Sequence, residues 1–271
     1  MSIHFLTFGG PTQHYHEAVY RLCLQAQQMN IFNNIYGLTE QALFQQKEFW
    51  NKHSDFILNN NRGYGYWIWK PYIIKRTLEQ MNNGDILLYL DSGCELNYLA
   101  REQLLYYIEM VKQQMLMGTS SGGSDLVWTK TELLKYFEVE NNKELLCVNQ
   151  VQACCLLMMK CDIIVNVVNE WYDICCNYDL IYDNTNNNFP EFNEHRHDQS
   201  VLSLLLKKHN LVNYGLDPTY VYDFNDYNVF IHITSHLPIW TARNRSGHSI
   251  LTQHILSYLH SQNPEGTETE K

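Results

Sequence analysis

Residues 85–91 form a continuous apolar run closed at each end by an aspartate, Asp-Ile-Leu-Leu-Tyr-Leu-Asp. A strand with one solvated face alternates apolar and polar residues, whereas a strand covered on both faces is apolar throughout. The turn signal Asn82-Asn83-Gly84 precedes the run, which we therefore interpret as a buried strand over residues 86–90. A chain with such a strand must supply helices for both faces of its sheet.

The segments around this strand alternate between strand-like and helix-like patterns. Short apolar or β-rich runs predict strands over residues 3–9, 31–38, 55–58, 154–159 and 229–233. Apolar residues near helical spacing predict helices over residues 15–28, 39–52, 71–81, 99–116, 162–176 and 198–208. Within residues 117–128 a Ser/Gly-rich turn leads into a further strand. This order predicts an α/β fold with a mainly parallel central sheet flanked by helices, and a ligand at the carboxyl ends of the strands.

The composition excludes several classes of partner. The 271 residues carry 19 Lys and Arg against 29 Asp and Glu, a net charge of -10, which disfavours nucleic acid and anionic lipid surfaces. We find no apolar stretch of the roughly 20 residues that span a membrane and no secretory leader, so we expect a cytoplasmic protein without integral membrane contact. We expect one domain over residues 1–260 and a polar, disordered tail over 261–271.

The eight cysteines indicate reduced, buried thiols rather than a disulfide framework. Two pairs are sequence neighbours, the others lie in apolar runs, and no Cys-x-x-Cys spacing occurs. Structural zinc is therefore not expected.

Asp91 is the first candidate for chemistry. A carboxylate just past a buried strand lies at the ligand-binding edge of an α/β sheet, where it can hold a hard divalent cation that bridges phosphates. The alternative is that Asp91, followed by Ser92-Gly93, only caps a turn. The aromatic block 62–71, with Arg62 and Lys70, favours a site, because aromatic faces stack on bases and sugars and cations neutralise phosphates. The alternative is that this aromatic block packs in the hydrophobic core.

A second candidate region is the run 194–199, Glu-His-Arg-His-Asp-Gln. Asp198 opens an apolar helix, as its N-cap or as a first-turn acid. The run is richer in functional groups than a cap requires, so we favour a site here. His195 and His197 are expected to be exposed polar residues.

These motifs resemble, in the same order, those of the GT-A glycosyltransferases, specifically the retaining galactosyltransferase and glycogenin-like family. Thr7-Phe8-Gly9 with Tyr15 resembles the family's nucleotide loop, Lys70 its donor-binding lysine, and residues 85–93 its metal-binding strand. Further along the chain, Gln152-Ala153-Cys154 resembles Asn-Ala-Gly, residues 197–203 resemble the helix opened by Asp-Gln, and Phe230-Ile231-His232 resembles the strand that carries a histidine. The resemblance covers about residues 3–245 and implies a Rossmann-like GT-A fold.

The resemblance also implies an activity and its residues. A sugar would pass from a nucleotide-diphosphate donor, with UDP expected, to an acceptor hydroxyl on a glycan, protein or glycolipid, with retention of configuration. Mn²⁺ or Mg²⁺ would be held by Asp91 and His232, with Glu95 a substitute ligand and His236 a reserve for His232. Donor contacts would come from Thr7, Phe8, Gly9, Tyr15, Lys70, Gln152 and Arg243, and catalytic contacts from Asp198 and Gln199.

The chain departs from the family pattern at two positions, and alternatives follow. Gly93 stands in place of the second aspartate of Asp-x-Asp, and Gln152 in place of the asparagine of Asn-Ala-Gly. A metal-free variant would use Lys70 with Arg243 or Arg245. If the enzyme inverts configuration, Asp198 becomes the candidate general base. Rival functions are a hydrolase or nucleotidyltransferase that uses a nucleotide sugar, and a catalytically degenerate carbohydrate- or nucleotide-binding protein.

Overall fold

A computed structural model describes residues 1–183, 188–216, 236–250 and 253 of the chain. Its centre is a five-stranded sheet in the order β2-β1-β3-β8-β5. The strands are β1 (Ile3–Gly9), β2 (Asn34–Thr39), β3 (Ile86–Leu90), β5 (Leu116–Met117) and β8 (Cys155–Met159). β1 pairs in parallel with β2 and β3, while β8 is antiparallel to both β3 and β5. Only β8 therefore runs against the others, which confirms the mainly parallel sheet of an α/β fold.

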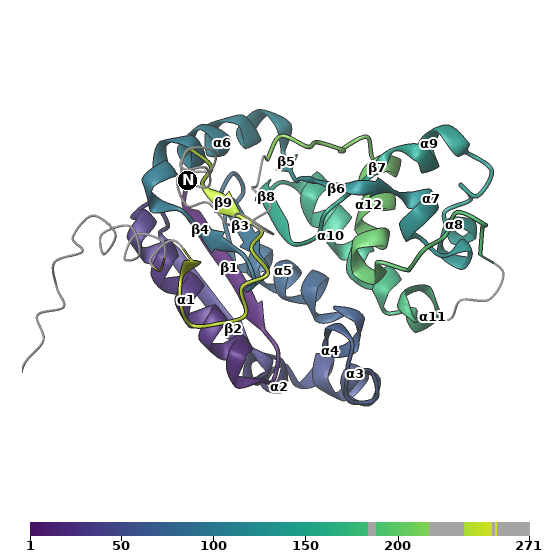
Figure 1. Ribbon diagram of the computed structural model, residues 1–271, viewed down its shortest axis with the longest axis horizontal. Helices are drawn as coiled ribbons and strands as arrows, with labels where there is room; N and C mark the ends of the chain where they lie inside the picture. Colours follow the sequence, from purple (N-terminus) through teal and green to yellow (C-terminus); the bar gives the residue numbers. More distant parts are fainter. Residues whose placement is uncertain (184–187, 217–235, 251–252, 254–271) are drawn as a thin grey trace, which may run out of the picture.

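Helices cover both faces of this sheet, as the unbroken apolar run of β3 requires (Figure 1). On one face, Ile86, Leu88 and Leu90 pack in a core with α1 (Gln13–Met29) and α6 (Arg101–Gln114). On the other face, Leu87 and Tyr89 pack in a core with α5 (Trp69–Gln80) and α10 (Asp162–Cys175). The helix α12 (His197–Lys208) packs on α10 and on β7 (Asn149–Val151).

Smaller elements complete the described part of the chain. Two further two-stranded sheets pair β4 with β9 and β6 with β7. The remaining elements are α2 (Glu40–Gln45), α3 (Lys47–Asn59), α4 (Gly63–Tyr66), β4 (Glu95–Leu96), η1 (Tyr98–Ala100), β6 (Ser120–Ser124), α7 (Asp125–Trp128), α8 (Thr131–Tyr136), α9 (Lys143–Cys147), α11 (Tyr178–Ile181) and β9 (Ile239–Trp240). Within the described residues, no helix combines the length and hydropathy needed to cross a membrane.

The strand predicted over residues 55–58 is wrong, because these residues lie in α3. The buried side chains of this helix are Phe49, His53 and Ile57, spaced four residues apart. Residues spaced in this way lie on one face of a helix. The short apolar run 55–58 continues that buried face, so it is helical.

Two other expectations also need correction. The Ser/Gly-rich stretch is itself the strand β6, and the residues after it form the short helix α7. All eight cysteines are free, as predicted, but Cys147 is exposed rather than buried. The predicted strand over 229–233 and the tail over 261–271 lie outside the described residues.

The chain between α3 and α5 follows a left-handed turn. Five consecutive residues have positive φ, from Gly63 at 59° to Trp67 at 60°. Such a conformation costs an L-residue roughly 1–2 kcal/mol, and glycine alone adopts it freely. The turn leads directly into α5, where the Lys70 amide donates to the Trp67 carbonyl at 2.9 Å. It therefore fixes where α5 begins.

We predict that Gly65→Ala destabilises the protein more than Gly84→Ala. Both glycines have positive φ, at 83° and 85°. A Cβ on Gly65 would lie 2.7 Å from Ile57 Cγ1, whereas a Cβ on Gly84 would meet nothing within 4 Å. We expect Gly84→Ala to lower the free energy of unfolding by about 1–2 kcal/mol, and Gly65→Ala by about 1–3 kcal/mol more. Urea unfolding measures both, and equal losses would contradict the tight packing of this turn.

Candidate active site

The candidate site lies where β1 and β3 end and β8 begins. Asp91 follows the last residue of β3, and its backbone N–H donates to the Cys154 carbonyl at 2.8 Å. β8 is antiparallel to β3, so the segment that precedes β8 reaches the same edge as the carboxyl end of β3. This edge is where an α/β sheet binds its ligand.

Lys70 joins two carboxylates at this edge. Its ammonium lies 3.2 Å from Asp91 Oδ1 and 3.3 Å from Asp198 Oδ2. The side chain of Lys70 is 3% exposed, that of Asp198 is 4% exposed and that of Asp91 is 30% exposed. Asp91 is therefore the member of this cluster that faces solvent. We call Lys70, Asp91 and Asp198 the carboxylate cluster.

Asp198 reaches the cluster from the first turn of α12, as its sequence position predicted. The preceding residue, His197, has a left-handed φ of 49°, so the chain turns sharply into the helix. The Trp171 indole of α10 donates to the Asp198 carbonyl at 2.8 Å. The Asp198 oxygen Oδ2 has no hydrogen-bond partner among the described residues beyond its ion pair with Lys70. A buried oxygen of this kind is available to a ligand hydroxyl.

The charges of the cluster determine its protonation. Burial raises the pKa of Asp198 to about 7, with the Asp91 carboxylate adding to the rise and the Lys70 ammonium opposing it. Burial alone would lower the pKa of Lys70, but the Asp198 and Asp91 carboxylates outweigh it and raise that pKa. Lys70 is thus a permanent cation. Asp198 exists near neutral pH as a mixture of acid and carboxylate and could exchange a proton with a bound hydroxyl.

The predicted residues Gln199 and Gln152 border the cluster. Gln199 Nε2 donates to Gln150 Oε1 at 2.8 Å, and its Oε1 accepts from the Ala153 backbone at 3.3 Å. Gln152 Oε1 accepts from the Cys154 thiol at 3.2 Å. Gln199 therefore ties the start of α12 to the segment before β8, and Gln152 lies at the same sheet edge.

The residues of the predicted nucleotide loop point in different directions. The Thr7 side chain is fully buried, and Phe8 packs on Trp69 with ring centroids 4.0 Å apart. A Cβ on Gly9 would lie 2.6 Å from the Tyr15 carbonyl oxygen, so glycine is needed for α1 to pack against β1. Tyr15, in the first turn of α1, is half-buried with the Arg245 guanidinium 5.5 Å from its ring centroid. Tyr15 is therefore the best placed of these four residues to touch a ligand with its side chain.

The described residues leave the predicted metal site untested, because one of its two ligands lies outside them. They contain no group of three His, Cys, Asp or Glu side chains placed to hold a metal ion. Asp91 Oδ1 already accepts a hydrogen bond from the Tyr89 hydroxyl at 2.6 Å and lies 3.2 Å from the Lys70 ammonium. Glu95 is fully buried and paired with Arg21, so it is no substitute ligand. His232 lies outside the described residues.

The aromatic block serves partly as core. Trp69 and Tyr66 are buried, and the Trp69 indole donates to the Gly63 carbonyl at 3.0 Å. Trp67 is half-buried and stacks on His197, with ring centroids 5.5 Å apart. The expectation that His195 and His197 are exposed is wrong, since both are buried. Burial lowers the pKa of His197 to about 4, so this ring is neutral.

Two residues of this region, Tyr89 and Arg21, were not predicted from the sequence. Tyr89 holds Asp91 through its hydroxyl, and the period of two along a strand could have placed them on one face. Arg21 is 3% exposed and pairs with Glu95 at 3.1 Å. An arginine on the apolar face of the predicted helix over 15–28 was the available signal for its burial.

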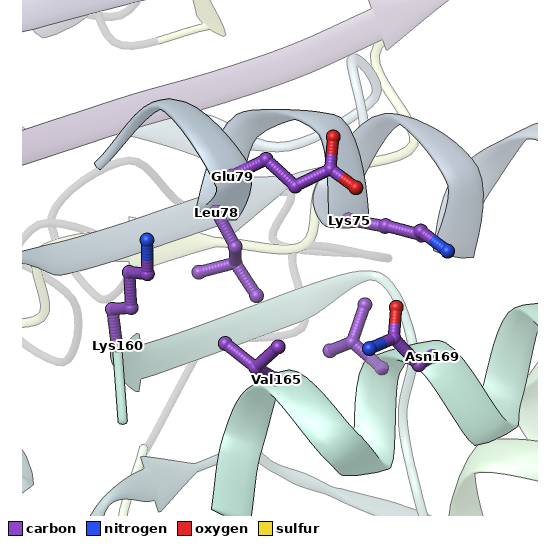
Figure 2. Close-up of a pocket in the computed structure, with 7 residues that line it drawn as sticks. Lys75, Leu78, Glu79, Lys160, Val165 and Asn169 are labelled. Carbon is purple, nitrogen blue, oxygen red and sulfur yellow. The ribbon is translucent and has the colours of Figure 1, made fainter. Parts of the chain in front are cut away.

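A separate small cavity of about 120 Å³ lies between α5 and α10, lined by Lys75, Glu79, Lys160, Asn169 and apolar side chains (Figure 2). The residues that α5 contributes come from its carboxyl half, whereas Lys70 lies in the first turn of that helix. The cavity is therefore not part of the carboxylate cluster.

No family model and no curated protein matches this chain. Among solved structures, it is similar to a glycosyltransferase involved in the glycosylation of the major capsid of PBCV-1, with a TM-score of 0.42 and 8% identity over 96% of this chain and 100% of that chain. It is also similar to mouse xyloside xylosyltransferase 1 in its apo form, with a TM-score of 0.47 and 11% identity over 89% of this chain and 98% of that chain. With TM-scores below 0.5, neither similarity establishes a family or an activity.

We predict that Asp198 makes stability depend on pH. Its pKa is higher in the folded than in the unfolded state, so the folded protein keeps a proton that the unfolded chain has lost. The stability this proton provides is complete below about pH 4 and is lost as pH rises through about 7. Relative to Asp198→Asn, the wild type should therefore lose on the order of a few kcal/mol between pH 4 and 8.

Urea unfolding at several pH values checks this, with Asp173→Asn as the control at an exposed carboxylate of α10. A constant difference between wild type and Asp198→Asn across this range would contradict the raised pKa.

Proposed function

We propose that this protein is a glycosyltransferase that moves a sugar from a nucleoside-diphosphate donor to an acceptor hydroxyl. The observation that carries the proposal is the carboxylate cluster: two carboxylates held by one buried ammonium at the carboxyl edge of an α/β sheet. The motif resemblance to the GT-A family supplies the reaction class and the expectation of UDP.

In this proposal the carboxylates bind the sugar at the bond that breaks. Asp91 is the exposed member and accepts hydrogen bonds from sugar hydroxyls at the mouth of the site. Asp198 lies deeper, with its Oδ2 contacted only by the Lys70 ammonium among the described residues and a pKa of about 7, and accepts the proton of the attacking hydroxyl if the enzyme inverts configuration. Lys70 holds both carboxylates in place and offsets their repulsion. The expectation that the sugar keeps its anomeric configuration rests on the family resemblance alone.

The departing nucleoside diphosphate gains negative charge, which the protein must stabilise. The resemblance predicts Mn²⁺ or Mg²⁺ for this role, at Asp91 and His232. Because His232 lies outside the described residues and Asp91 Oδ1 is engaged by Lys70 and Tyr89, we derive no step through such an ion. Addition of EDTA tests the prediction directly.

A binding protein without turnover is the second candidate. It is favoured by Asp91 Oδ1 being engaged by both Lys70 and Tyr89, and by Gly93 in place of a second carboxylate. Nucleotide binding without release of UDP from any sugar donor would select it.

We predict that Asp91→Asn abolishes donor turnover while leaving the fold intact. The assay follows UDP release from UDP-glucose, UDP-galactose, UDP-xylose and UDP-N-acetylglucosamine, with Mn²⁺ and with EDTA. Loss of one electrostatic contact to the reacting centre should lower turnover by about 100-fold or more. The melting temperature should fall, but the protein should stay folded, because Lys70 keeps its ion pair with Asp198.

Asp173→Asn is the matched control and should keep wild-type turnover. Wild-type turnover in Asp91→Asn would refute the assignment of Asp91. No turnover by the wild type with any donor, but protection by UDP in a thermal shift, would point to the binding protein.

A further inference from the structure

The segment 237–250, which we call the strap, lies along the loop that follows Asp91. β9, within the strap, pairs with β4 in antiparallel fashion. The backbone N–H of Asn97 donates to the Pro238 carbonyl at 2.9 Å, and the backbone N–H of Asn244 donates to the Gly93 carbonyl at 2.9 Å. A stretch far along the chain thus borders the mouth of the carboxylate cluster.

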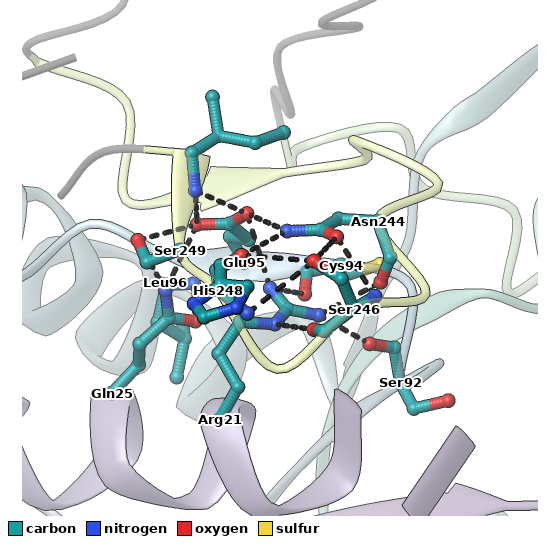
Figure 3. Close-up of polar contacts among 11 residues, drawn as sticks. Arg21, Gln25, Ser92, Cys94, Glu95, Leu96, Asn244, Ser246, His248 and Ser249 are labelled. Carbon is teal, nitrogen blue, oxygen red and sulfur yellow. Dashed lines mark hydrogen bonds and ion pairs between the residues drawn. The ribbon is translucent and has the colours of Figure 1, made fainter. Parts of the chain in front are cut away.

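A buried ion pair fastens the strap to α1 (Figure 3). Arg21 of α1 lies 3.1 Å from Glu95 Oε1, and its side chain is 3% exposed. The Arg21 guanidinium donates to four backbone carbonyls, those of Ser92, Cys94, Asn244 and Ser246. Two of these belong to the loop after Asp91 and two to the strap, so a single side chain fixes the loop and the strap together.

Glu95 completes the attachment from the other side. Its carboxylate accepts from the side chains of Gln25, Asn244 and Ser249 and from the backbone N–H of Ile250. A buried ion pair of this kind costs desolvation and contributes little net stability, but its hydrogen bonds define one geometry. Three of these four donors lie on the strap or at its end, so the geometry it defines is that of the strap.

The strap carries two exposed arginines, Arg243 and Arg245, on either side of Asn244, whose backbone N–H bonds the loop after Asp91 at Gly93. The Arg243 Cα lies 3.4 Å from the position that a Cβ on Gly93 would take. Arg243 has a left-handed φ of 49°, a conformation that a non-glycine residue adopts at an energetic cost. The Arg245 guanidinium lies over Tyr15, in the first turn of α1.

The charge at this mouth favours an anion bound by arginine. Asp91 and Asp198 repel a diphosphate, and Lys70 is buried between them. A dianion that approaches Asp91 therefore needs further cations. Arginine is suited to this, because its planar guanidinium donates two parallel hydrogen bonds to phosphate oxygens. Arg243 and Arg245 lie within three residues of one another, whereas the other five arginines of the chain are far apart in sequence.

We propose that Arg243 and Arg245 bind the diphosphate of a nucleoside diphosphate, that the Arg21–Glu95 pair positions them by holding the strap, and that this binding needs no divalent cation. The identity of the ligand as a sugar donor rests on the proposed function, whereas the anion site itself does not.

The test measures the affinity of inorganic pyrophosphate and of UDP by calorimetry in a buffer that contains EDTA. The wild type should bind both. Arg243→Ala and Arg245→Ala should each weaken binding by about 10-fold or more, since each removes charge-assisted hydrogen bonds. Arg101→Ala, at an exposed arginine that opens α6, is the control and should bind as wild type.

A second variant tests the positioning role without leaving a buried charge unpaired. Asn244 lies between the two arginines, and its side chain donates to Glu95 at 2.6 Å and to the His248 carbonyl at 2.7 Å. Asn244→Ala should weaken pyrophosphate binding but keep the wild-type salt dependence, because both arginines remain. The arginine variants should flatten that salt dependence, because a charge is lost. An effect on folding alone would leave the affinity of the folded protein unchanged.

The outcomes separate this inference from the proposed function. Pyrophosphate binding that requires Mn²⁺, or that survives both arginine substitutions, overturns the arginine site even if UDP-sugars are turned over. Arginine-dependent binding in EDTA supports it even if no donor is turned over. Absence of binding to the wild type under both conditions overturns it as well.

Discussion

One buried ammonium holds the centre of this molecule together. Lys70 comes from α5, Asp91 from the end of β3 and Asp198 from the start of α12, and each ion pair is shorter than 3.5 Å. An ammonium this far from water is tolerated only with anionic partners, so the three elements have to meet at one point. The left-handed turn before α5 and the left-handed first residue of α12, His197, fit this requirement, because both set where a helix begins.

Much of the scaffold follows from local patterns in the sequence. The apolar run 86–90 is a strand buried on both faces, and the helical spacing over 162–176 and 198–208 gives α10 and α12 to within a residue or so. Local patterns also mislead where a short apolar run fits both a strand and a helix. Residues 55–58 are the example, because the buried face of α3 is visible only when Phe49 and His53 are read with Ile57.

The site is less accessible to such reasoning. Asp91 and Asp198 stand out from the sequence because each carboxylate follows or opens an apolar element. That Lys70 joins them depends on how α5, β3 and α12 pack, and no local pattern carries this information. The same limit affects Glu95, which is near Asp91 in sequence but faces Arg21 in a separate buried pair. Nearness in sequence at the end of a strand does not mean nearness in the site, because the chain turns between Asp91 and Glu95, where the Cys94 backbone N–H donates to the Asp91 carbonyl at 2.8 Å.

The Arg21–Glu95 pair has a consequence for the order in which the chain folds. Arg21 donates to the Ser246 carbonyl, across 225 residues of sequence. During synthesis, β1 and α1 can form early, but the guanidinium of α1 then lacks half of its carbonyl partners until residues near 246 leave the ribosome. Contacts of such long separation form late and slow folding. The sheet and its first helices should therefore assemble as an intermediate, and the mouth of the site should be the last region to reach its native geometry.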